Sequence, residues 1–162
     1  MFHLFGRFNK KDKANALLIG EELWRQVGDA MREDLDTFNK YLQTTFTAGY
    51  CYGFIRMSFS NLGYGLDSEK LTDCWISFIS FSVFNSNKLH TIIKNQMQFM
   101  ETAKDLGNQE PLDAFTKGAS VGAFDAGLRF LGEGRGESPL NLQRYLLNQN
   151  LVWEDNLGLL PS

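Results

Sequence analysis

Glycine recurs four residues apart in two segments that otherwise have the pattern of a helix, and each glycine pair precedes a charged residue. A glycine inside a helix costs about 1 kcal/mol relative to alanine, so such a pattern indicates that something requires the missing side chains. A helix face without side chains lets a second backbone approach closely. The residues of the pattern are Gly49, Gly53 and Arg56 in the first segment, and Gly118, Gly122, Asp125 and Arg129 in the second.

We expect these two helices to cross at their glycines and to bring Arg56 close to Asp125. Both charged residues have apolar neighbours in the sequence, so each needs a partner if it is buried. Arg129 lies one turn after Asp125, where it can assist the same carboxylate. Two interpretations stay open: tight helix packing locked by a buried ion pair, or a groove in which Arg56 and Asp125 contact a small apolar or anionic ligand.

Histidine and cysteine, the usual residues of metal sites and of nucleophilic catalysis, are scarce in this chain. His3 and His90 are the only histidines, and neither has the Glu-x-x-His spacing of a metal-binding helix. Cys51 and Cys74 are too far apart for a zinc or redox motif and predict two buried thiols. The glycine-rich run 132–136 follows a predicted helix and lacks the Lys and Ser or Thr of a phosphate loop. We therefore expect no metal, no cofactor and no enzymatic activity.

The composition is that of an ordinary globular protein. The chain has 162 residues, of which 43% are hydrophobic and 22% charged. A net charge of -3 argues against a nucleic-acid partner, because phosphate backbones are bound by basic surfaces. No apolar run reaches the length of a membrane span, and the start lacks the apolar stretch of a secretory signal. These features predict a cytoplasmic protein.

Apolar residues recur every three or four positions over much of the chain, as in amphipathic helices. The longest such pattern, over 13–46, predicts a long helix that either bends near Gly28 or protrudes into a partner. The segment 74–84 is apolar on nearly every side, so its period fits a buried helix and a buried strand, and its helical flanks favour a helix. The other signals are a break at 44–48, a turn at 61–65, a helix between residues 87 and 107, a helix over 111–131 and a short helix starting at 138–139.

These elements predict an all-α fold: a single-domain helical bundle of five to seven helices with a long N-terminal amphipathic helix. We expect an N-terminal arm over 1–12 and a single helical domain over 13–162. Residues 1–11 combine apolar and basic side chains, as membrane anchors do, but so short a segment buries little area. We therefore expect no membrane contact from residues 1–11.

The long helix predicted over 13–46 carries an acidic face at residues 21–36. Acidic surfaces match basic partners and speed association, and aromatic residues anchor interfaces. Without a catalytic constellation, the sequence predicts a non-enzymatic protein-binding module, such as an inhibitor, an immunity-type protein or an adaptor, that binds another protein with a basic surface. Self-association through the long helix would produce a homo-oligomer. The residues expected on the partner-binding surface are Glu22, Asp29, Glu33 and Asp36.

Overall fold

The computed structural model describes residues 8–64, 69–130 and 139–152, and this part of the chain forms seven α-helices and no strand. The predicted all-α bundle is therefore confirmed. The ambiguous segment 74–84 is helical as far as Ser82. The helices are α2 (Lys10–Glu33), α3 (Leu35–Leu42), α4 (Thr45–Asn61), α5 (Glu69–Ser82), α6 (Lys88–Asp105), α7 (Glu110–Phe130) and α8 (Asn141–Leu146).

The long N-terminal helix is present, but the expected bend near Gly28 is wrong. The helix α2 starts after Asn9, whose side chain accepts from the Asp12 N–H while the Asp12 carboxylate accepts from the Asn9 N–H. It ends at Asp34, where the chain turns and α3 begins. The Asp34 carboxylate accepts hydrogen bonds from the Thr37 N–H and hydroxyl at 3.1 and 2.8 Å, and these bonds lower its pKa. One acidic residue thus ends α2 and caps α3.

Two other helix boundaries follow the sequence signals. The break expected at 44–48 lies at Thr44, whose hydroxyl accepts from the Thr47 N–H at the start of α4. The helix α6 ends at Asp105, and Gly107 just beyond it has φ of +81°, a conformation that glycine adopts without a steric cost. The N–H groups of Gly107 and Asn108 donate back to carbonyls of the last turn at 2.9 and 2.8 Å. This closure is a Schellman motif.

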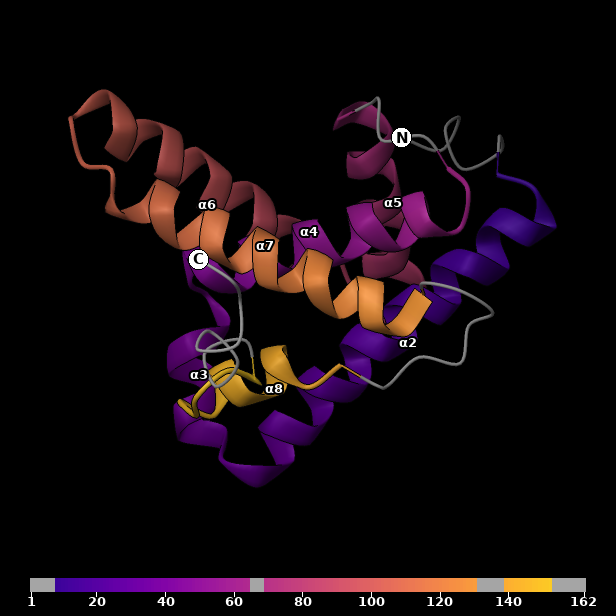
Figure 1. Cartoon of the computed structure of the whole chain (residues 1–162), viewed down its shortest axis with the longest axis horizontal. Helices are drawn as coiled ribbons and strands as arrows, with labels where there is room; N and C mark the ends of the chain where they lie inside the picture. Colours follow the sequence, from indigo (N-terminus) through magenta and orange to yellow (C-terminus); the bar gives the residue numbers. More distant parts are fainter. Residues whose placement is uncertain (1–7, 65–68, 131–138, 153–162) are drawn as a thin grey trace, which may run out of the picture.

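The helices α4 and α7 form the central pair of the bundle, and the other helices are arranged around them (Figure 1). The helix α6 packs on both members of this pair, while α5 contacts α2, α4 and α6. The helix α2 extends along one side, and α8 lies against α2, α3 and α7. The largest side chains that are fully buried include Tyr50 and Phe54 of α4 and Ile19 and Leu23 of α2. The core therefore lies where α2, α5, α6 and α8 pack around the central pair.

Three sequence predictions fall wholly or partly outside the described residues. The glycine-rich run 132–136 lies there entirely. The N-terminal arm predicted over 1–12 lies there up to residue 7, as does most of the segment 1–11 considered for membrane contact, while residues 10–12 belong to α2. The short helix expected from 138–139 begins slightly later, at Asn141.

Candidate functional site

The predicted glycines lie where α4 crosses α7, and the crossing itself is confirmed. A Cβ built on Gly49 would lie 2.1 Å from the Phe115 carbonyl oxygen, and one built on Gly53 would lie 2.1 Å from that of Ala119. Such distances are far inside van der Waals contact with a backbone that cannot rotate away, so no side chain fits. Gly118 and Gly122 of α7 face the carbonyls of Phe46 and Tyr50 of α4 in the same way, at 2.2 Å each. The opposing backbone fills the glycine stripe.

The expected contact between Arg56 and Asp125 is wrong. Asp125 is buried, and its carboxylate accepts hydrogen bonds from the Tyr50 hydroxyl at 2.5 Å and the Asn141 side-chain amide at 2.7 Å. Arg56 is exposed. Successive helix positions are rotated by about 100°, so Tyr50 and Arg56 leave α4 in different directions. The Asp125 carboxylate is therefore stabilised by hydrogen bonds in the core rather than by an ion pair with Arg56.

Arg129 is expected to assist Asp125, but it joins its own helix, α7, to α2 instead. Its Nε donates to Glu22 Oε1 at 3.0 Å and so ties α7 to α2. Glu22 also lies 3.6 Å from Arg25 of its own helix, and its side chain is largely covered. Glu22 was predicted to face a partner protein, so this placement corrects that prediction: the residue belongs to an internal ion pair.

Sequence reasoning missed the buried polar network around Asp125. Gln26 is fully buried, its amide donates to the Tyr50 hydroxyl at 3.1 Å, and its carbonyl oxygen accepts from the Leu142 N–H at 2.9 Å. Asn141 completes the network through its bonds to Asp125. Each polar group is satisfied, as burial requires. The network fastens α8 to α2, α4 and α7, and its one sequence signal is a glutamine at a core-facing position of α2.

Burial governs the titration of these groups. It raises the pKa of Asp125, against the hydrogen bonds from Tyr50 and Asn141, which lower it. Burial and then the nearby Asp125 charge raise the pKa of the Tyr50 hydroxyl well above its ordinary value. Burial also raises the pKa of the Cys51 thiol to about 12, so this cysteine is not a thiolate at neutral pH. The network is suited to holding helices together.

A histidine–carboxylate pair joins α5 to α6, and the sequence spacing offered no sign of it. The His90 Nε2 lies 2.9 Å from Asp73 Oδ1, and the Lys94 ammonium lies 3.6 Å from the same oxygen. Nucleophilic catalysis would need a hydroxyl or thiol on the imidazole. Across the described residues, no such group is hydrogen-bonded to the His90 ring. The pair fixes the corner between two helices.

The other residues of the predicted acidic surface lie at the corner between α2 and α3. Asp29 is 3.8 Å from Arg25 and 2.5 Å from Arg32, so much of its charge is neutralised within α2. Glu33 and Asp36 are exposed. We call Glu33, Asp34 and Asp36 the acidic corner. It retains the negative surface charge that the sequence predicted, over a smaller area.

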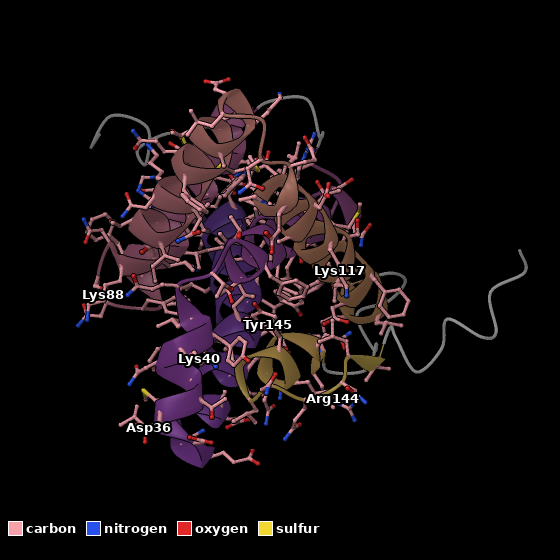
Figure 2. The ribbon with its side chains drawn as sticks, turned by 90° about the vertical axis from the view of Figure 1, so that its left-hand side faces the viewer. Asp36, Lys40, Lys88, Lys117, Arg144 and Tyr145 are labelled. Atoms are coloured by element: carbon pink, nitrogen blue, oxygen red, sulfur yellow. The ribbon has the colours of Figure 1, made fainter. Side chains whose placement is uncertain are left out.

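An apolar groove of about 550 Å³ opens beside the acidic corner, between α2, α3, α4 and the start of α6. Its rim carries large apolar side chains that stay open to solvent: Trp24 is 44% exposed, Met31 39% and Leu35 55%. The Trp24 ring meets the Phe84 ring edge-on, with the centroids 5.2 Å apart. Lys88 lines the α6 side and lies on the same side of the molecule as Asp36 (Figure 2). The remaining lining is mostly apolar and includes Val27, Phe38, Leu42, Ala48, Cys51, Leu89, Ile92 and Ile93.

A second hollow, of about 410 Å³, lies over the seam between α4 and α7. Of the residues expected in a ligand groove, Gly53 and Arg56 line it. Gly49, Gly118 and Gly122 do not line it, and the opposing helix backbone occupies the side-chain space at all four glycines. The residues predicted to form a small-ligand groove therefore do not line one common hollow.

No family model, curated protein or solved structure matches this chain. In the described ranges, no helix is both long and apolar enough to cross a membrane. The same ranges contain no group of three or more His, Cys, Asp or Glu side chains that could hold a metal ion. The case for a function therefore depends on the geometry of the groove and the acidic corner.

Proposed function

We propose that this chain is a non-enzymatic protein-binding module whose docking surface is the apolar groove together with the acidic corner. The observation that supports this proposal is the exposed row of Trp24, Met31 and Leu35 along the rim of a hollow lined with further apolar residues. Large apolar side chains that gather around a hollow mark interaction sites. Tryptophan and methionine are also enriched at the centres of protein interfaces.

The occupant that fits this surface is an amphipathic helix of another protein with basic residues at its edge. Such a helix places side chains at i, i+3 or i+4, and i+7 into an apolar groove. Glu33 and Asp36 offer exposed charge to its basic edge, and the lowered pKa of Asp34 keeps that carboxylate ionised. An inhibitor, an immunity-type protein or an adaptor would all use a surface of this kind. We place the protein in the cytoplasm, in keeping with its two free cysteines.

A designed peptide tests this proposal without knowledge of the natural partner. The peptide is a helix with leucines at i, i+4 and i+7 and lysines beside them, and its control carries glutamates in place of the lysines. When isotope-labelled protein is titrated with the lysine peptide, we expect amide shifts at the α2–α3 corner and at the start of α6. Added salt should weaken this binding because the charges are exposed. Shifts spread over other faces, or equal binding of both peptides, would contradict the proposal.

A further inference from the structure

The sequence of α2 has a row of positions whose spacing alternates between three and four residues, and the row ends at Leu35, the first residue of α3 after the turn at Asp34. This alternation averages 3.5 residues, the repeat of a helix that packs along a second helix. The four large apolar side chains of the row are open to solvent, Leu17 at 38% together with the groove rim residues Trp24, Met31 and Leu35. We call this row the outer seam, and its positions are Ala14, Leu17, Glu21, Trp24, Gly28, Met31 and Leu35.

The charge along α2 changes sign from one end to the other. Its first turns carry Lys10, Lys11 and Lys13, all exposed, while its far end joins the exposed acidic corner. The one early acid, Asp12, caps the helix and accepts a hydrogen bond from the Tyr64 hydroxyl at 2.5 Å. The N-terminal half of α2 is therefore a basic amphipathic helix with exposed leucines. That is the chemistry expected of the occupant of the groove.

We infer that two copies of this chain dock on each other with their α2 helices antiparallel. This inference is based on the proposed function, since it uses the groove as a protein-docking surface. The two-fold axis lies near the middle of the outer seam, where Trp24 of one copy meets Gly28 of the other. Leu17 then approaches Leu35 of the second copy, and Lys13 approaches the second copy's Asp36. A two-fold axis repeats each contact, so the basic end of each α2 helix meets the acidic corner of the other copy.

Gly28 provides the space that this arrangement needs. Gly28 is itself buried among its neighbours, but a Cβ built on it would meet nothing nearer than the Arg32 guanidinium, at 3.8 Å, so a recess lies over this position. Trp24 is the largest side chain of the outer seam and lies one turn away, so a large group faces a small one across the axis. The 24 residues of α2 span about 36 Å, which is long enough for several layers of contact. One helix pair buries less than a standard interface, so we expect a micromolar dimer.

Sedimentation of the full chain over a wide concentration range at low salt tests the dimer. The wild-type protein should move from monomer to dimer as its concentration rises, and salt should shift it back. Leu17→Glu leaves the groove intact and changes an exposed residue, so the chain should stay folded by circular dichroism while its dimer weakens by at least about tenfold. Leu106→Glu is the matched control, because Leu106 is 82% exposed at the end of α6 and does not line the groove. A wild-type monomer at every concentration would overturn the inference, as would a dimer that Leu17→Glu leaves unchanged.

Charge reversal tests the antiparallel arrangement. Lys13→Glu and Asp36→Lys should each weaken the dimer, and the chain that carries both changes should regain it, because each reversed charge then meets its reversed partner. Failure of the double variant to regain the dimer would overturn the arrangement. A monomeric protein that still binds the lysine peptide would overturn self-docking and leave the proposed function standing. A wild-type protein that neither binds the lysine peptide nor dimerises would overturn both the proposed function and the dimer.

Discussion

Asp125 belongs to a buried network that joins α2, α4, α7 and α8. Its carboxylate accepts from Tyr50 of α4 and from the side chain and the backbone N–H of Asn141 at the start of α8. Gln26 of α2 reaches the same cluster through the Tyr50 hydroxyl. Removing one partner from a buried network leaves the others unsatisfied, which is more costly than the net gain from a single hydrogen bond. The position of α8 is therefore set by polar chemistry.

The raised pKa of Asp125 predicts how stability depends on pH. The unfolded chain loses this proton near 3.8, while the folded chain keeps it to a higher pH. In that window the folded state binds more protons, so the contribution of Asp125 to the unfolding free energy falls as pH rises. Urea unfolding of the wild type and Asp125→Asn from about pH 4 to about pH 8 measures this, and the wild type should lose stability relative to the variant.

Asp34 is the matched control for this experiment, because its pKa is lowered by the bonds from Thr37. Its contribution is fully present above 3.8 and is lost as pH falls through the lower folded value. Asp34→Asn should therefore differ from the wild type by a constant amount above about pH 5. A wild-type advantage over Asp125→Asn that grows with pH would contradict the direction assigned to Asp125.

At the scale of the helices, the central feature is the contact of α4 with α7. Pairs of glycines on each helix face carbonyl oxygens of the other, so the two backbones touch directly. Phenylalanine packs at the edges of this contact: Phe115 is buried in α7, and the Phe54 ring lies edge-on to Phe130 with the centroids 6.1 Å apart. The four glycines and these phenylalanine rings thus have a common role. They build one close helix crossing.

Gly122→Ala tests the close approach, with Gly127→Ala as its control on the same helix. The added methyl at Gly122 would lie 2.2 Å from the Tyr50 carbonyl oxygen, so α4 and α7 must separate. We expect a loss of about 3 kcal/mol in the unfolding free energy, at the upper end of overpacking costs. The methyl at Gly127 meets nothing within 4 Å, so there the higher helix propensity of alanine should stabilise by up to about 1 kcal/mol. Equal effects at the two positions in denaturant unfolding would contradict the packing role.

The positions of the helices and most of their ends could be predicted from the sequence, because the signals for them are local. Gly107 supplies the positive φ that closes the end of α6, and Thr44 caps the start of α4. Both effects depend only on residues nearby in the sequence. The turn at Asp34 escaped prediction because Leu35 and Phe38 continue the apolar spacing of α2 across it. Periodicity reports which face is apolar and does not reveal that the helix axis has changed direction.

The contacts of the candidate site were less predictable, because they join distant parts of the chain. The glycine spacing was enough to predict the α4–α7 crossing, since a stripe without side chains has few other uses in a helix. The partners of the charged residues depend on how the helices are rotated: Tyr50 meets Asp125 over a separation of 75 residues, and Glu22 meets Arg129 over 107. No spacing within one helix encodes such a pairing.

The whole molecule has two unlike sides. Where α4 meets α7 the helices are joined by backbone contact, ring packing and the buried network, whereas the side formed by α2 and α3 keeps Trp24, Met31 and Leu35 open next to the acidic corner. Leaving such residues exposed lowers solubility unless a partner covers them. The docking surface and the outer seam share these residues, so one face serves both proposals.

The affinity of the lysine peptide for two variants tests the docking surface most directly. Leu35→Glu places a charge on the groove rim, and Leu106→Glu places the same charge at the end of α6, outside the groove. Both residues are exposed, so both variants should fold like the wild type. We predict that Leu35→Glu raises the Kd by about tenfold or more, while Leu106→Glu leaves it unchanged. Equal Kd values for the two variants would show that the groove is not the docking surface.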